Sequence, residues 1–138
     1  MRGLILVGAL LLSWPFTAYA ENVRVDKVIS VYDADTFRVD IAGWPDIVGK
    51  NMSVRVNGVD AAEIRGKCEG EKQLARQARD FTRQFLANGQ VIELRNIQRG
   101  KYFRLLADVY VDGHSLTDAL LQSGLARPYD GGSRQGWC

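Results

Sequence analysis

Alternating apolar and polar positions run along the first part of the sequence, and they predict β-strands. Residues 23–31 alternate and are rich in β-branched side chains, and residues 36–41 continue the pattern after a turn. A third predicted strand covers residues 53–59, with Val54 and Val56 on one face and Arg55 and Asn57 on the other. We therefore expect three strands before the middle of the chain, the third of them polar on one side.

The hydrophobic period lengthens between Glu69 and Ala87, which predicts an amphipathic helix there. Its apolar stripe consists of residues spaced three or four apart: Leu74, Ala78, Phe81 and Phe85. The Asn88-Gly89 pair that follows is a typical helix end, because both residue types tolerate a left-handed backbone. The sequence thus places one long helix at the centre of the chain.

Two more strands and a short helix complete the pattern. Residues 91–94 and 105–111 read as strands on either side of a basic turn at 99–101, and a capped helix should run from Ser115 to Gln122. All five strands are compatible with antiparallel pairing. We predict an α+β, mainly β fold, a five-stranded OB-type barrel with the central helix between strands three and four and the short helix after strand five. The alternative is a small α+β domain without a closed barrel.

The first twenty residues differ in kind from the rest. Arg2 supplies a positive end, residues 4–12 are almost wholly apolar, and Ala18-Tyr19-Ala20 is a small-x-small site. We interpret residues 1–20 as a cleaved signal peptide, because the apolar run is too short to anchor the chain across a hydrocarbon core of about 30 Å. The mature domain, 21–138, is then exported to the periplasm or the cell exterior as a monomer without stable membrane association.

The composition allows one globular domain of ordinary core density. The chain has 138 residues, of which 46% are hydrophobic, and its 18 Lys and Arg against 16 Asp and Glu give a net charge of +2. A two-domain enzyme is excluded by this length, and so is a glycosyltransferase of the D-x-D type. Because the net charge is small, an anionic partner must be bound by a local cluster of basic residues.

Export also bears on the two cysteines. In an oxidising compartment Cys68 and Cys138 favour a disulfide between the start of the central helix and the last residue. Closing so long a loop is worth about 4 kcal/mol in the chain-entropy account. Two independent thiols are the alternative. A zinc site is disfavoured, since the cysteines and His114 supply at most three of the four usual ligands.

Two short acidic motifs follow predicted strands, one with Asp33 and Asp35, the other with Asp60 and Glu63. Carboxylates that converge repel one another unless a hard cation neutralises them, and an oxygen-only donor set points to calcium or magnesium. Either motif alone is weak evidence, because Asp-x-Asp is common in ordinary turns. Separate solvated surface charges are therefore the alternative for each.

Two arginines add weight to the acidic motifs. Arg55 lies on the polar face of the strand that leads into Asp60, and Arg104 follows the basic turn. A guanidinium can hold a phosphate by two parallel hydrogen bonds, so two arginines, a divalent cation and a free carboxylate form a phosphodiester site. The alternative for each arginine is a surface salt bridge worth at most ~1 kcal/mol.

Four segments occur in an informative order: V-Y-D-A-D-T-F, V-R-V-N-G-V-D-A-A-E, K-Y-F-R-L-L-A-D-V-Y-V-D-G and L-L-Q-S-G-L-A-R-P-Y. Together they resemble the staphylococcal nuclease-like, or thermonuclease, family, from about Val23 to Tyr129. The resemblance implies an OB-type barrel and a calcium-dependent hydrolase of DNA and RNA. Its products would carry 3′-phosphate and 5′-hydroxyl ends.

The resemblance also implies a role for individual residues. The catalytic positions of the family fall on Arg55, Glu63 and Arg104, its calcium ligands on Asp35, Asp60 and the main-chain carbonyl of Ala61, and substrate contacts on Lys101, Tyr102 and Tyr129. Glu63 would be the general base. For the tyrosines, packing on the barrel is the alternative.

Three departures from the family pattern are visible, each of which is expected to shift a loop and weaken activity. Ala34 replaces Gly, Ala62 replaces Pro, and Phe103 replaces the Gly before the second catalytic arginine.

Two hypotheses of function follow from the sequence: a secreted nuclease, and a non-catalytic OB-type module that binds nucleic acid or another anion. Glu63 favours the enzyme, because binding an anion needs basic residues but no carboxylate among them.

Overall fold

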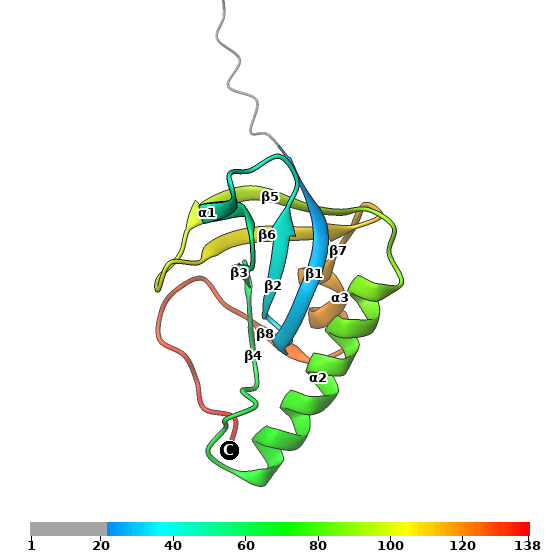
Figure 1. Ribbon diagram of the computed structural model, residues 1–138. Coiled ribbons are helices and arrows are strands. Elements are labelled where there is room, and N and C mark those ends of the chain that lie inside the picture. The colour runs from blue at the N-terminus through cyan, green and yellow to red at the C-terminus, as the bar shows by residue number, and fades with distance from the viewer. Residues whose placement is uncertain (1–21) are drawn as a thin grey trace, which may run out of the picture.

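Five strands close into a barrel in the computed structural model, which describes residues 22–138 (Figure 1). The strands are β1 (Val23–Asp33), β2 (Thr36–Ile41), β3 (Met52–Val56), β5 (Ile92–Arg99) and β6 (Leu105–Val111). They pair in the order β3-β2-β1-β5-β6, and a further pairing of β3 with β6 closes the ring. The predicted OB-type architecture is confirmed.

The closing pair is parallel, with Val54 opposite Leu105, whereas the other pairs of the barrel are antiparallel. The sequence-based expectation of antiparallel pairing was therefore wrong at this seam. The reason is geometric: an odd number of strands cannot close into a ring with every neighbour antiparallel. The parallel seam places Arg55 of β3 beside the strand that follows Arg104.

Four shorter elements lie around the barrel: α1 (Asp46–Gly49), β4 (Val59–Ala61), β7 (His114–Ser115) and β8 (Ala126–Pro128). The predicted third strand is too long, because β3 ends at Val56 and an Asn57-Gly58 turn separates it from β4. Gly58 has a φ of +87°, a conformation that residues with a Cβ avoid. After this turn Asp60 lies in β4, which pairs with β8.

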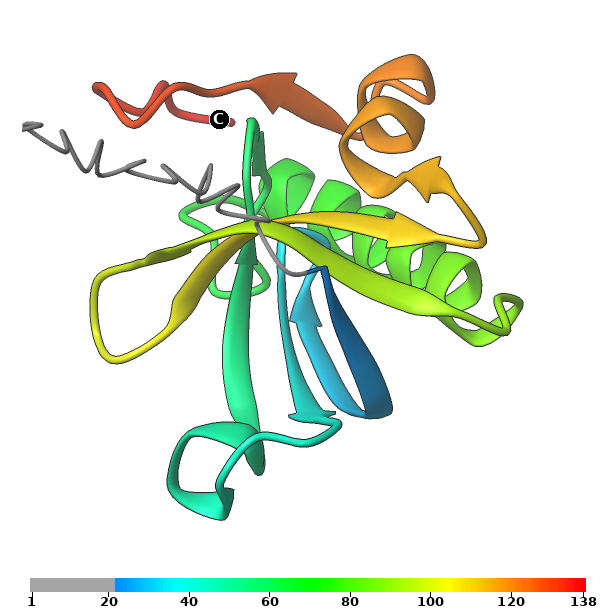
Figure 2. The same cartoon turned by 90° about the horizontal axis from the view of Figure 1, so that it is seen from above.

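The central helix α2 (Glu69–Ala87) has the predicted bounds and packs against β1 (Figures 1 and 2). Its buried face is formed by Glu71, Ala75, Ala78, Thr82 and Leu86. The predicted stripe is thus rotated: Ala78 is central, but Leu74, Phe81 and Phe85 only flank the contact. Small residues occupy the centre because the helix approaches the barrel closely, and Thr82 Oγ1 donates to the carbonyl of Ala34 at 2.8 Å.

The second helix, α3 (Leu116–Gln122), begins at Ser115, whose Oγ accepts a hydrogen bond from the amide of Asp118 at 3.2 Å. This is the predicted N-terminal cap. Leu116 and Leu120 of α3 join the barrel interior, which is filled by fully buried side chains of four strands: Phe37, Val39, Val54, Val56, Leu94 and Val109.

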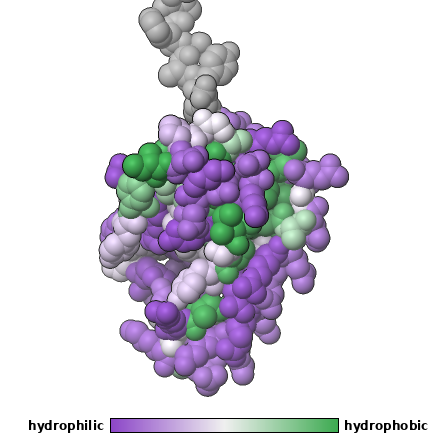
Figure 3. All heavy atoms as spheres, viewed as in Figure 1, coloured by the Kyte–Doolittle hydropathy of each residue, from purple (hydrophilic) through white to green (hydrophobic). Residues whose placement is uncertain are grey.

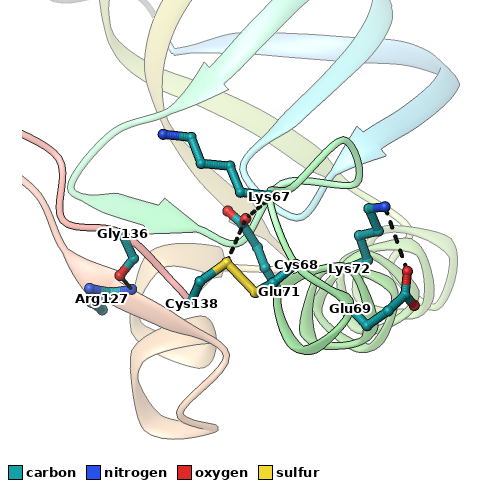
Figure 4. Close-up of a disulfide and its surroundings, with 8 residues drawn as sticks. All are labelled: Lys67, Cys68, Glu69, Glu71, Lys72, Arg127, Gly136 and Cys138. Carbon is teal, nitrogen blue, oxygen red and sulfur yellow. Dashed lines mark hydrogen bonds and ion pairs between the residues drawn. A yellow bond between two sulfur atoms is a disulfide. The ribbon is translucent and has the colours of Figure 1, made fainter.

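The face shown in Figure 3 is mostly hydrophilic, with hydrophobic side chains in small patches. None of the helices in residues 22–138 has the length and apolar character needed to cross a membrane. The predicted signal peptide, residues 1–20, lies outside the described residues. Cys68 and Cys138 are joined in a disulfide, with their Cα atoms 5.9 Å apart (Figure 4).

Candidate active site

Arg55 connects the two predicted ligand carboxylates. From strand β3 its Nη1 forms an ion pair with Asp35, in the turn between β1 and β2, and its Nη2 lies 3.6 Å from Oδ1 of Asp60 in β4. The Nη2 atom also donates to the carbonyl of Val59 at 3.1 Å. The two carboxylates are buried, with 3% of Asp35 and 5% of Asp60 exposed, and Arg55 is 13% exposed. The fold of the barrel therefore places Asp35 and Asp60 in contact with the same guanidinium, that of Arg55.

Asp35 is also tied to the main chain around it. Its Oδ2 accepts a hydrogen bond from the amide of Ala61 at 2.8 Å, and its Oδ1 accepts one from Thr36 Oγ1 at 3.1 Å. Its own carbonyl accepts from the amide of Val56 at 2.8 Å. Asp35, Asp60 and Ala61, which the resemblance places around calcium, thus lie together where the β1–β2 turn meets β4.

Asp33 lies at the edge of this cluster. Its Oδ1 accepts a hydrogen bond from the amide of Ile64 at 2.9 Å, so it holds the chain just after Glu63. Burial raises the pKa of Asp33 above its ordinary value, an effect that the Ile64 hydrogen bond and Arg55 partly oppose. The negative charges of Asp35 and Glu63 raise it further.

Arg55 and Arg104 line one pocket of about 340 Å³, together with Lys101 and Tyr129. Its remaining lining residues are Arg99, Gly100 and Leu106, so four cations and no carboxylate surround it. Nε of Arg104 is buried and has no hydrogen-bond partner among the described residues. A buried donor without a partner is unfavourable unless a ligand meets it, and the cationic lining selects an anion.

The loop between β5 and β6 carries two exposed aromatic side chains at its tip. Tyr102 is 90% exposed and Phe103 60% exposed, and both have a positive φ, 58° and 53°. A positive φ is unfavourable for bulky residues, whereas Gly adopts it freely. Gly is the usual residue of the family at the position of Phe103. The guanidinium of Arg104 lies 6.0 Å from the Tyr102 ring. Of the predicted substrate contacts, Lys101 and Tyr129 line the pocket and Tyr102 stands outside it.

Glu63 meets a residue that the sequence did not indicate. Nη1 of Arg134 donates to Glu63 Oε1 at 2.7 Å, and Nε and Nη2 of the same guanidinium lie 2.8 and 2.7 Å from Oδ1 of Asp60. Burial lowers the pKa of Arg134, but the hydrogen bonds and charges of Glu63 and Asp60 outweigh it and raise that pKa above its usual value. Nε1 of Trp137 donates to the other oxygen of Asp60 at 3.4 Å.

The cysteines contain the signal that could have revealed Arg134. A disulfide from Cys138 to Cys68 returns the last residues to the chain five positions after Glu63. The side chains just before Cys138 must then lie near the second acidic motif. The two cysteines thus predict the bond, and the position of Arg134 follows from the bond.

The carboxylates fit a hard cation by donor type. Each carboxylate oxygen has two lone-pair sites, so Asp35 can accept a further bond beside those to the protein, whereas Oδ1 of Asp60 already faces two nitrogen atoms of Arg134. Calcium takes carboxylate and main-chain oxygens of this kind.

Another group, Cys68, Cys138 and Glu71, has its ligand atoms within 4.8 Å of one another. Both sulfurs are used in the disulfide, so neither is a thiolate ligand, and the 3.7 Å contact to Glu71 in Figure 4 involves a sulfur without a proton.

Comparison with known proteins bears on the same region. The family described as staphylococcal nuclease homologues matches residues 53–135, which include Arg55, Asp60, Glu63 and Arg104. The chain is 33% identical over 107 residues to the thermonuclease of Staphylococcus hyicus, across 77% of this chain and 60% of that protein.

Two Bacillus subtilis proteins are similar to the same extent. Endonuclease YncB is 34% identical over 108 residues, across 77% of this chain and 47% of its own length. The SPbeta prophage-derived endonuclease YokF is 32% identical over 108 residues, across 77% of this chain and 33% of its own length. The chain thus spans between one third and three fifths of these three relatives.

Proposed function

The chain belongs to the family of staphylococcal nuclease homologues, and from this premise we propose that it hydrolyses phosphodiester bonds of DNA and RNA. The observation that carries the proposal is the pocket in which Arg55 and Arg104 face one space with no carboxylate in its lining. Arg55 also contacts Asp35 and Asp60, so an anion pocket adjoins an oxygen-donor cluster. That combination suits a phosphodiester beside a divalent cation.

The proposal includes a calcium ion as cofactor. Asp35, Asp60 and the carbonyl of Ala61 would hold it, and it would neutralise charge and polarise a phosphate oxygen as a Lewis acid. The named relatives are nucleases, and the oxygen-only donor set supports a hard cation. The arginines bind and orient the phosphate, because a guanidinium offers paired donors and stays charged at neutral pH.

Glu63 is the proposed general base. Its side chain is 45% exposed, so a water molecule can reach it and give up a proton to a carboxylate oxygen. The water oxygen forms the new bond to phosphorus, and the bond from phosphorus to the 5′ oxygen breaks. The 5′ oxygen takes a proton from solvent, which leaves 3′-phosphate and 5′-hydroxyl ends. Arg55 and Arg104 donate to the phosphate oxygens as negative charge grows on them.

A non-catalytic binding module is the second candidate, and one observation favours it. Arg134 bonds both Asp60 and Glu63, so the acidic motif can serve as an anchor for the end of the chain. In that case the cationic pocket would bind nucleic acid and Glu63 would perform no chemistry.

The test is cleavage of a single-stranded DNA oligonucleotide by the purified protein, first with calcium and then with a chelator. Turnover that calcium supports and the chelator abolishes is expected. Glu63→Gln should lower kcat by roughly 10²–10⁴-fold, whereas Glu69→Gln, a matched change at a carboxylate that is 75% exposed, should not alter it.

The product ends provide a second readout. Fragments with a 5′-hydroxyl are labelled by polynucleotide kinase without prior phosphatase treatment. Oligonucleotide binding without any cleavage would identify the binding module instead. Wild-type turnover by Glu63→Gln would remove Glu63 from the mechanism.

We also propose that the protein is exported, with cleavage after Ala20. The disulfide supports this, because such bonds persist in oxidising compartments. Mass spectrometry of the exported protein would show a chain that starts at Glu21.

A further inference from the structure

The last nine residues, 130–138, form a segment that we name the C-terminal strap. It leaves the barrel after β8, runs beside β4 and ends at the start of α2 (Figures 1 and 2). The Cys68–Cys138 disulfide fixes its end (Figure 4). The strap therefore passes over the part of the candidate active site that contains Asp60 and Glu63.

Arg127 of β8 holds the strap at a second point. Its guanidinium lies 3.5 Å from the centroid of the Trp137 ring, within cation–π range. Its Nη2 donates to the carbonyl of Gly136 at 2.8 Å, and its Nη1 to Oε1 of Gln135 at 3.3 Å. These contacts involve three successive residues of the strap, so its path is set by more than the disulfide.

Arg134 is the strap residue that reaches the site. Nε and Nη2 of its guanidinium both contact Oδ1 of Asp60, and Nη1 donates to Oε1 of Glu63. With Trp137 Nε1 on the second oxygen of Asp60, the strap engages both oxygens of that carboxylate. A cation bound by Asp60 would need the same oxygens, and a general base at residue 63 would need its carboxylate free of a bound guanidinium.

We propose that the strap is an internal competitor, in which Arg134 occupies Asp60 and Glu63 and the cation must displace it. The inference rests on the proposed function, because it takes Asp60 to be a cation ligand. Arg134 is four residues from a covalent anchor, which keeps it at a high effective concentration beside the carboxylates. The strap thus lowers cation affinity and withholds Glu63 until the ion binds. Arg55 does not compete in this way, since it is part of the barrel.

The experiment is calorimetric titration of the purified, oxidised protein with calcium chloride, which reads binding without turnover. Arg134→Ala should raise calcium affinity about tenfold, because it removes a cation with contacts to two carboxylates. Arg134→Gln, which keeps polar length but no charge, should give a similar gain. Arg76→Ala, on the exposed side of α2, removes the same charge elsewhere and should change the affinity less than twofold.

Cys138→Ser separates the tether from the charge. It keeps Arg134 but frees the end of the strap, so calcium affinity should rise by less than in Arg134→Ala. Amide hydrogen exchange in residues 130–137 of the wild-type protein should become faster when calcium is added. Unchanged exchange, or equal affinity in wild type and Arg134→Ala, would overturn the competition. A weaker affinity in Arg134→Ala would also overturn it and would show instead that Arg134 orders the ligands.

Asp60→Asn distinguishes the failure of this inference from failure of the proposed function. Calcium binding that needs Asp60 but is insensitive to Arg134→Ala removes the strap proposal alone. If neither the wild-type protein nor any variant binds calcium, both proposals fall. Circular dichroism of each variant confirms that the barrel is folded before titration.

Discussion

Strand β3 and the C-terminal strap each bring an arginine to Asp60, but they hold it in different ways. Arg55 belongs to a strand paired on both sides, with β2 and β6, and only 13% of its side chain is exposed. Arg134 belongs to a segment without helix or strand and is 42% exposed. The first is fixed by the ladders of the barrel, the second by the disulfide and the contacts with Arg127.

This difference indicates that Arg55 is a permanent part of the site and that Arg134 can be displaced from it. Displacing Arg55 would leave Asp35 buried without a cation, whereas Arg134 can exchange its partners for water at little cost. Removing one partner of a buried ion pair strongly destabilises the folded protein, because the other charge stays buried without a partner. Removing one partner of a solvated ion pair has little effect, because water takes its place. We therefore expect substitution of Arg55 to lower the free energy of unfolding much more than substitution of Arg134.

The largest effect is expected for Arg55→Ala. It should lower the free energy of unfolding by about 3–5 kcal/mol, because the nearly buried carboxylate of Asp35 loses its cationic partner. Urea unfolding followed by circular dichroism measures it. Arg38→Ala, on the neighbouring strand β2 with an exposed hydrogen bond to Asn51, is the matched control. A loss below 1 kcal/mol in Arg55→Ala would show that the barrel arginine is as replaceable as the strap arginine.

Cys138→Ser should have the next largest effect, a loss of up to about 4 kcal/mol, since the bond spans a sequence separation of 70 residues. The loss arises in the unfolded state, so the far-ultraviolet circular dichroism of the folded barrel should not change. Cys68→Ser and the double variant are the controls and should match Cys138→Ser. Disagreement among the three would mean that the thiols, and not the bond, carry the effect.

Arg134→Ala should have the smallest effect on stability, about 1 kcal/mol or less, because its guanidinium is 42% exposed and Asp60 keeps Arg55 as a cationic neighbour. The same urea experiment measures it. Combined with Arg55→Ala it should be non-additive by about 0.5 kcal/mol or more, since both arginines contact Asp60. Simple additivity would contradict the shared contact on which the comparison depends.

Local patterns were sufficient for the elements that depend on near neighbours. The limits of α2 and β2 follow from the change of hydrophobic period and from the turns that bound them. Ser115 as a helix cap is equally local, since its partner is Asp118. The acidic motifs and Arg55 were also found, because strand alternation placed them at strand ends or on a polar face.

Contacts between distant residues set the remaining features. The parallel pairing of β3 with β6 follows from closing five strands, which no single segment reveals. The buried face of α2 centres on Ala75, Ala78 and Thr82, because close packing on the barrel favours small side chains over the large ones that dominate a hydrophobic pattern. The third strand was extended too far because strand alternation was followed through an Asn-Gly turn.

The sequence by itself determined the chemistry that is available: three aspartates and a glutamate, Arg55 on a strand and Arg104 just before one, and a pair of cysteines. Only the tertiary structure decided which charges meet. Arg134 reaches Asp60 and Glu63 across 74 and 71 positions of the chain, a contact set by the path of the strap between two anchors. Ion pairs have no local periodicity, so their partners follow from where the folded backbone places them.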